Sequence, residues 1–179
     1  RRMRDYDVVQ IINPMFLEMK SERIRPIYEY LRKHNKRMFM GAYGMDYYWV
    51  NTCRSTQTFR YSDFNFGDRL RTDDIAMTEV RDWIGTDKGR LNQEIAADCD
   101  GIAAGLYEYY ACYHPAFPDK TEFIPFPINT DTTVRTAPPV TDKVRFFIGV
   151  QKSRGVYKGT DVMLRALERV ADRHPDRCE

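Results

Sequence analysis

Five short runs of apolar residues restrict the fold of this 179-residue chain more than any other feature of its sequence. Their side chains are apolar at consecutive positions instead of alternate ones, which is typical of strands buried on both faces. Stretches with helical periodicity separate the runs. This alternation predicts an α/β fold, a Rossmann-like parallel sheet flanked by helices on both faces. The runs span residues 8–12, 38–42, 101–105, 122–126 and 144–150.

Three helices are predicted from an apolar face behind a residue suited to cap the first turn. The capping residues are Ser21, Thr86 and Thr160, whose hydroxyl groups accept hydrogen bonds from free N–H groups at a helix start. The helix after Ser21 has the clearest apolar face, with the spacing expected for one side of a helix. That face consists of Ile24, Ile27, Tyr28 and Leu31.

Two regions interrupt the alternation of strands and helices. Residues 51–83 are polar and aromatic without a clean period, so we predict an insertion made of loops and one helix. Residues 130–142 contain two adjacent prolines and several threonines, which is typical of a linker. We therefore expect a partial Rossmann-like domain over residues 1–129, then the linker, then the first strand and helix of a second domain over residues 143–179.

Charge and cysteine usage exclude several classes of function. The 28 basic and 26 acidic residues leave a net charge of +2, too small for the basic footprint of a nucleic-acid-binding domain. The four cysteines form no CxxC pair, and with three histidines they make no recognisable zinc set, so we expect reduced thiols in a cytoplasmic protein. The basic start is not followed by the apolar region of a secretory signal, and no apolar run is long enough to span a bilayer.

Several segments resemble one enzyme family in their order and spacing. Residues 123–131 resemble the segment that closes the first domain of the group 1 retaining glycosyltransferases (family GT4), which have the two-domain GT-B fold. Residues 144–149 followed by residues 158–161 resemble the opening of the second domain of that family. Residues 7–9 resemble a segment in the middle of its first domain. The apolar and aromatic character of residues 41–46 is similar to that of the family branch that builds bacterial surface polysaccharides.

The resemblance implies part of a retaining glycosyltransferase that moves a sugar from a UDP- or GDP-linked donor to a saccharide or lipid-linked acceptor. It implies no catalytic metal and no cofactor besides the nucleotide sugar, and a place in surface polysaccharide synthesis at the inner face of the membrane. The chain lacks an initiator methionine and the E-x7-E pair of the family, so we expect an incomplete chain that is inactive alone. Peripheral membrane contact and self-association through a bare sheet edge both stay open.

Four residues are assigned to the donor diphosphate through this resemblance. Negative charge builds up on the departing diphosphate, so basic groups placed there in advance stabilise it. Arg154 offers a planar fork and Lys158 a compact charge, and Lys152 is a substitute because the arginine of the family usually lies one residue nearer the strand. Gly159 lets the backbone approach at a helix start that suits an anion. The alternative is a solvated basic turn with an ordinary turn glycine.

The acceptor side of the cleft is assigned from position in the sheet, because ligands gather at the carboxyl ends of parallel strands. Asp46 is the one carboxylate considered for catalysis, positioning a sugar hydroxyl, and a helix cap is the alternative. Glu108 is better explained by a place in a first helical turn. The remaining catalytic residues are expected outside this chain. The residues assigned to this side are Asn13, Tyr43, Gly44, Asp46 and Glu108.

The insertion contains an aromatic run interleaved with arginines. Such a run rests on a membrane surface or stacks on sugar rings, and the simpler alternative is that its rings pack the insertion onto its domain. It consists of Phe59, Tyr61, Phe64 and Phe66 with Arg60, Arg69 and Arg71.

Two other classes of protein were weighed against a GT-B transferase. A metal-dependent GT-A transferase is disfavoured because the DxD sequences at residues 5–7 and 98–100 precede their strands, at the wrong edge of a parallel sheet for a ligand. A non-catalytic Rossmann-like module, which binds a partner or a sugar phosphate, is the alternative that stays open.

Overall fold

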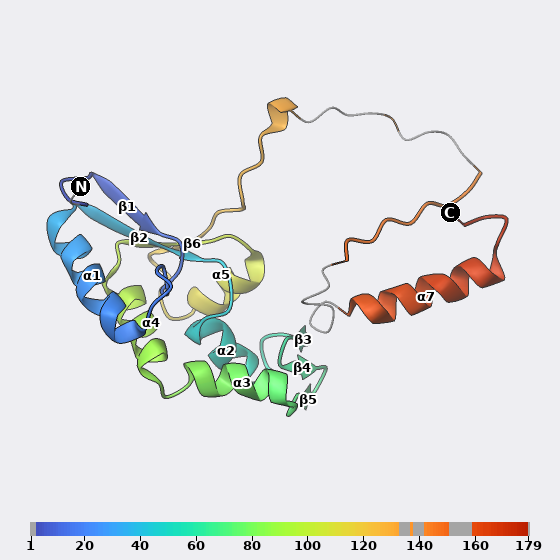
Figure 1. The fold of residues 1–179 in the computed structure, drawn as a ribbon, viewed down its shortest axis with the longest axis horizontal. Helices are drawn as coiled ribbons and strands as arrows, with labels where there is room; N and C mark the ends of the chain where they lie inside the picture. Colours follow the sequence, from blue (N-terminus) through green and yellow to red (C-terminus); the bar gives the residue numbers. More distant parts are fainter. Residues whose placement is uncertain (1–2, 133–136, 138–141, 151–158, 179) are drawn as a thin grey trace. The chain divides into compact units, whose positions relative to one another are not determined.

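The computed structural model describes residues 3–132, 137, 142–150 and 159–178. The chain forms two compact units, one over residues 1–128 and the other over residues 129–179 (Figure 1). The buried hydrophobic residues of the described chain all lie between Ile11 and Tyr113, so the first unit contains this core. No helix among the described residues is both long enough and apolar enough to cross a membrane.

A four-stranded parallel sheet forms the centre of the first unit. Its strands lie side by side in the order in which they occur in the chain. They confirm the first four predicted runs and the predicted α/β fold, in which a parallel sheet is flanked by helices. The strands are β1 (Val8–Ile11), β2 (Arg37–Ala42), β6 (Gly101–Ala104) and β7 (Thr121–Phe123).

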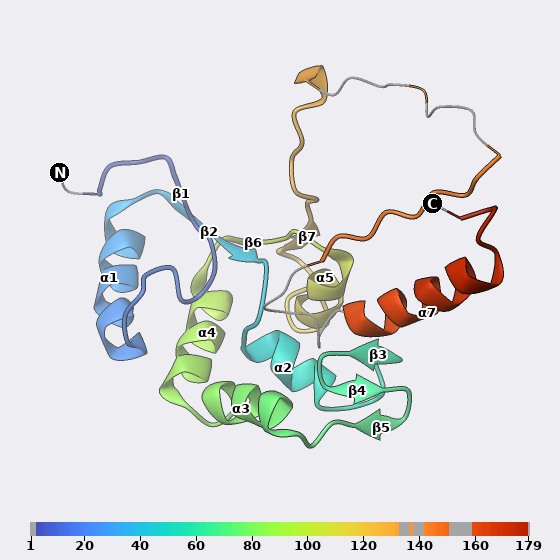
Figure 2. The same cartoon turned by 45° about the vertical axis from the view of Figure 1, so that its right-hand side comes forward.

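The helices that connect these strands all lie on one face of the sheet (Figures 1 and 2). Parallel strands in chain order are joined by right-handed crossovers, and each such crossover places its helix on the same side. The flanking helices are therefore confirmed, but on one face instead of the two predicted. On the opposite face, Val8 is 57% exposed. The helices are α1 (Ser21–His34), α2 (Tyr47–Cys53), α3 (Asp74–Trp83), α4 (Asp87–Asp98) and α5 (Tyr107–Tyr113).

The apolar face predicted for α1 is the face that joins the core. Ile24, Tyr28 and Leu31 are buried in the same cluster as Met38 and Met40 of β2, and Ile27 is half-buried at its margin. The helix therefore packs as its periodicity indicates.

Of the predicted helix caps, Thr86 is confirmed and Ser21 is not. Thr86 is the N-cap of α4, and its Oγ1 accepts a hydrogen bond from the backbone N–H of Gly89 at 3.1 Å. Ser21 is instead the first residue of α1, after Lys20. The Ser21 side chain is buried and bonds Asp87 at the start of α4, so its hydroxyl joins two helices and does not cap its own.

The insertion over residues 51–83 contains the predicted helix, α3, and also a small sheet that was not predicted. Three strands of two residues each form an antiparallel meander, which lies at the far end of the unit from β1 (Figure 2). Strands of two residues are too short to show an alternating pattern in the sequence. The sequence therefore predicted loops where the meander lies. The strands are β3 (Tyr61–Ser62), β4 (Asn65–Phe66) and β5 (Arg69–Leu70).

The second unit contains one of the two elements predicted for it. The helix α7 (Thr160–Arg173) is present, after a short 3-10 turn, η1 (Thr130–Thr132). The prediction of a strand over residues 144–150 is wrong: Val144 makes only an isolated bridge to Cys178, and Phe147 is 95% exposed. A strand pairs with a neighbouring strand over several residues, and the described residues of this unit supply only that bridge.

Candidate functional site

The carboxyl ends of the four parallel strands meet along one side of the sheet, which we call the carboxyl edge. The loops that follow β1 and β2 bring Asn13, Tyr43 and Gly44 to this edge. The loops approach closely, because a Cβ atom built on Gly41 would lie 2.4 Å from the carbonyl oxygen of Ile12. The carboxyl edge is where a ligand of an open parallel sheet is expected.

Two aromatic rings lie over glycines at this edge, on the face of the sheet without helices. A Cβ atom on Gly41 would lie 2.4 Å from the ring of Tyr43, and one on Gly105 would lie 2.8 Å from the rings of Tyr43 and Phe126. The two ring centroids are 5.2 Å apart, and the rings are tilted by 49°. We call Tyr43, Phe126 and the two glycines beneath them the aromatic platform. Phe126 is 52% exposed, so the platform is open to solvent.

Amide groups from the first strand and its loop lie at the same edge. Gln10 donates a hydrogen bond from Nε2 to the hydroxyl oxygen of Tyr43 at 3.1 Å. The Oδ1 atom of Asn13 is buried and has no hydrogen-bond partner among the described residues. An acceptor buried in this way favours a nearby donor, such as a ligand hydroxyl, because an unsatisfied polar group costs about 1–3 kcal/mol.

Asp46 lies inside the protein and not on the platform. Its side chain is 2% exposed and caps α2, where Oδ1 accepts a hydrogen bond from the backbone N–H of Trp49 at 2.9 Å. Oδ2 accepts a second hydrogen bond from the Tyr113 hydroxyl at 2.8 Å. Burial raises the pKa of Asp46 to about 6, although these hydrogen bonds oppose the shift. The helix-cap alternative is thus the role observed, and the carboxylate does not face an open cleft.

Asn92 and Tyr113 complete a buried network that the sequence did not reveal. Asn92 accepts a hydrogen bond from the backbone N–H of Tyr47 at 2.9 Å and donates one to the Tyr113 hydroxyl at 3.1 Å. Burial raises the pKa of Tyr113 well above its ordinary value. Both side chains are fully buried, so the network joins α2, α4 and α5 and contacts no solvent. A polar residue in the middle of a predicted helix was the only signal available for Asn92.

Neither Gly44 nor Glu108 makes a contact within the described residues that indicates a ligand. A Cβ atom on Gly44 would meet nothing within 4 Å, so the backbone there does not require glycine for space. Glu108 lies in the first turn of α5, as the structural alternative predicted, where a negative charge suits the helix dipole.

Three of the four residues assigned to the donor diphosphate, Lys152, Arg154 and Lys158, lie outside the described residues. Gly159 is described and is the N-cap of α7 in place of the predicted Thr160, with a φ angle of +60°. Glycine adopts this left-handed conformation readily, whereas a side chain there is strained. This accounts for Gly159 as a turn residue, and its phosphate role stays a prediction.

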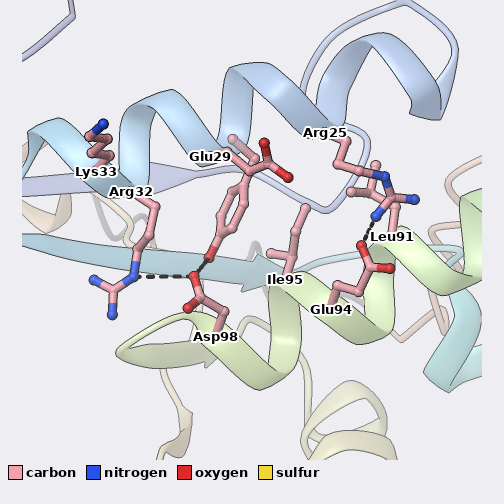
Figure 3. A pocket seen from close by; sticks show the side chains of 9 residues that line it. Arg25, Glu29, Arg32, Lys33, Leu91, Glu94, Ile95 and Asp98 are labelled. Atoms are coloured by element: carbon pink, nitrogen blue, oxygen red, sulfur yellow. Dashed lines mark hydrogen bonds and ion pairs between the residues drawn. The ribbon is translucent and has the colours of Figure 1, made fainter.

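A groove of about 350 Å³ runs between α1 and α4 (Figure 3). Its charged residues pair across the two helices: Arg25 with Glu94, and Arg32 with Asp98 at 3.1 Å. The Tyr28 hydroxyl donates to Asp98 at 2.7 Å, and burial raises the pKa of this tyrosine. These contacts hold the two helices together, so we assign the groove a structural role.

No family model, no curated protein and no solved structure matches this chain. The resemblance to glycosyltransferases therefore stays a prediction. Within the described residues, no three histidine, cysteine, aspartate or glutamate side chains are grouped as metal ligands would be.

Proposed function

We propose that the first unit is the acceptor-side domain of a glycosyltransferase, and that its aromatic platform binds a saccharide acceptor. The full-length enzyme would take the sugar from a UDP- or GDP-linked donor and act on the cytoplasmic side of the membrane. The proposal rests on one observation: the half-buried ring of Tyr43 and the exposed ring of Phe126 lie over glycines at the carboxyl edge of a parallel sheet.

The chemistry of a sugar matches that surface. A pyranose ring has an apolar C–H face and a rim of hydroxyl groups. The face suits an aromatic ring, and the hydroxyl groups suit nearby amides. Tyr43 and Phe126 supply the rings, while Gln10 and Asn13 supply amide groups at the same edge.

The donor side of the reaction is assigned to Lys152, Arg154 and Lys158. Their positive charge would offset the negative charge that builds up on the departing diphosphate. Because these residues and the platform belong to different units, the proposal predicts separate effects of mutations on donor and acceptor. In this way the two halves of the proposal are tested independently.

The test uses the protein from its full open reading frame. Tyr43→Ala is expected to raise the KM for a saccharide acceptor about tenfold with the KM for the nucleotide sugar unchanged, since it removes one stacking surface. Tyr107→Ala is the matched control, because Tyr107 is 65% exposed and lies outside the platform. Equal acceptor KM values for Tyr43→Ala and the unaltered enzyme would disprove the platform assignment.

The non-catalytic module has one observation in its favour, which is that Asp46, the candidate carboxylate, is buried and already hydrogen-bonded. Such a module would bind a saccharide at the platform without turnover. Absence of sugar transfer by the full-length protein from UDP- and GDP-sugars, with saccharide binding retained, would favour it over the transferase.

A further inference from the structure

One face of the β3–β5 meander exposes aromatic rings beside arginines. Tyr61 and Phe66 are a cross-strand pair, and they are 62% and 61% exposed. Arg69 lies opposite Phe66 on the same face of the ladder. The guanidinium of Arg60 lies 5.4 Å from the ring centroid of Tyr61. We call Arg60, Tyr61, Phe66 and Arg69 the meander face.

The other face of the meander packs against the domain and holds the strands in place. Asn65 is fully buried, and its Nδ2 donates to the backbone carbonyls of Phe59, Arg60 and Gly67. Trp49 of α2 donates from Nε1 to Asp63 at 3.2 Å. The meander is therefore stabilised from its inner face, whereas the rings of Tyr61 and Phe66 are exposed.

The aromatic run of the insertion thus divides into two roles. Phe64 is buried and Phe59 packs against Trp49, with ring centroids 5.5 Å apart, as the packing alternative predicts. Tyr61 and Phe66 are exposed, and the guanidinium of Arg71 lies 5.8 Å from the ring centroid of Phe66. Exposed aromatic side chains that lie together usually mark an interaction surface.

The charge around the meander face indicates the kind of partner. The meander face contains two arginines, Arg60 and Arg69. Arg71 is paired with Asp73, whereas Arg60 and Arg69 pair with no carboxylate in the described part of the chain. Asp68, in the β4–β5 turn, is the acidic residue on this side. The excess positive charge is complementary to phosphate groups.

We propose that the meander face docks on a membrane that contains anionic lipids, with Tyr61 and Phe66 at the level of the headgroups and Arg60 and Arg69 on lipid phosphates. A tyrosine, with one polar and one apolar part, favours this interface, a phenylalanine adds apolar surface there, and arginines add electrostatic attraction to anionic lipids. The meander follows the carboxyl end of β2 through α2, so docking here would bring the carboxyl edge toward the membrane. The inference does not depend on the donor chemistry proposed above.

Vesicle co-sedimentation tests this surface with the full chain. We expect binding to vesicles of phosphatidylcholine with phosphatidylglycerol, and much weaker binding to phosphatidylcholine alone. The double variant Arg60→Gln/Arg69→Gln should lose about fivefold in binding to anionic vesicles for each arginine. Tyr61→Ser/Phe66→Ser should reduce binding to both kinds of vesicle, and the control Tyr107→Ser should leave binding unchanged.

A second measurement needs no variant. Hydrogen exchange of the backbone amides over residues 58–71 should slow when anionic vesicles are added to the unaltered protein, while exchange in α4 stays the same. The proposal is overturned if the protein does not bind anionic vesicles, if both double variants bind them like the unaltered protein, or if a soluble oligosaccharide slows exchange in the meander and vesicles do not.

Discussion

At the scale of single residues, the space above a glycine decides where an aromatic ring is able to lie. A Cβ atom at Gly41 would meet both the Ile12 carbonyl oxygen and the Tyr43 ring at 2.4 Å. The carbonyl belongs to the backbone and has little freedom to move. Glycine at this position is therefore required by packing, whereas Gly44, two residues beyond β2, has open space around it.

The substitution Gly41→Ala should destabilise the protein by about 1–3 kcal/mol, the cost of forcing an added methyl group into a packed site. Gly44→Ala is its matched control and should have little effect. The free energy of unfolding in urea measures both. Equal midpoints for the two variants would contradict the packing around Tyr43.

The buried carboxyl group of Asp46 makes stability depend on pH. Its pKa of about 6 in the folded protein lies above the ordinary value of 3.8. Between these pH values the folded protein binds more protons than the unfolded chain, so this group makes stability fall as pH rises. Relative to Asp46→Asn, the unaltered protein should lose about 2 kcal/mol between pH 4 and pH 6 and less than about 0.5 kcal/mol above that. Urea unfolding across this range measures the difference, and parallel curves would refute it.

The role of a residue is predictable from the sequence when its hydrogen-bond partners lie close to it along the chain. Thr86 and Gly89 lie in one helical turn, so the cap of α4 was predictable from local sequence. Asp46 and Tyr113 are 67 residues apart, and only the tertiary structure brings them together. The sequence therefore left two roles open for Asp46, and could not identify Tyr113 at all.

At the scale of elements, three helices meet at one tyrosine. Tyr113 of α5 donates a hydrogen bond to Asp46 at the start of α2 and accepts one from Asn92 of α4. A buried network of this kind stabilises a structure only when each member has a partner. Its loss should loosen the packing of all three helices.

Tyr113→Phe should destabilise the protein by about 1–3 kcal/mol, because it leaves the buried amide of Asn92 without an acceptor. Tyr110→Phe, on the same helix but only half-buried, should change stability by less than about 0.5 kcal/mol. Thermal unfolding of the two variants checks the contrast. A similar loss in both would show that the hydroxyl of Tyr113 is not specifically needed.

Helices and strands were predictable where their sequence consists mainly of apolar residues that become buried. The strands β2 and β6 are apolar apart from Arg37 at the start of β2, and helical patterns flank them, so their positions were correct within one or two residues. Residues 144–150 are similarly apolar apart from Arg145, but the described part of the chain offers them only the bridge from Val144 to Cys178. Local composition does not reveal whether a partner strand exists. For this reason the strand predicted from an apolar run was correct at β2 and wrong at residues 144–150.

At the scale of the whole molecule, the buried core belongs to one unit. The buried hydrophobic residues of the described chain lie between Ile11 and Tyr113, and the apolar residues of α7 such as Val162 are exposed. Burial of apolar surface is the main source of folding stability. The first unit should therefore account for most of the stability of the chain.

A chain that ends at Ile128 should unfold in urea at the same midpoint as the whole chain and with one cooperative transition. A second variant, Ile95→Ala in the whole chain, should lower the midpoint by the equivalent of about 2–5 kcal/mol, since Ile95 is fully buried. A lower midpoint for the shortened chain would show that residues 129–179 contribute to the core.

The fold class was predictable because it needs only the order of strands and helices, whereas the side on which the helices lie depends on the spatial order of the strands. A Rossmann-like fold with a different strand order has helices on both faces of its sheet. Here β1, β2, β6 and β7 are in chain order, so one face remains without helices. The aromatic platform lies on that face, and its existence could not be read from the pattern alone.

This one-sided arrangement separates two kinds of evolutionary change along the same strand. In β2, Met38 and Met40 point into the core, whereas Phe39 and Gly41 between them point to the other side. Substitution of Phe39 alters what the open face recognises and leaves Met38 and Met40 in the interior, whereas packing requires glycine at position 41. A lineage is therefore able to change this surface at those alternate positions of the strand that packing leaves free.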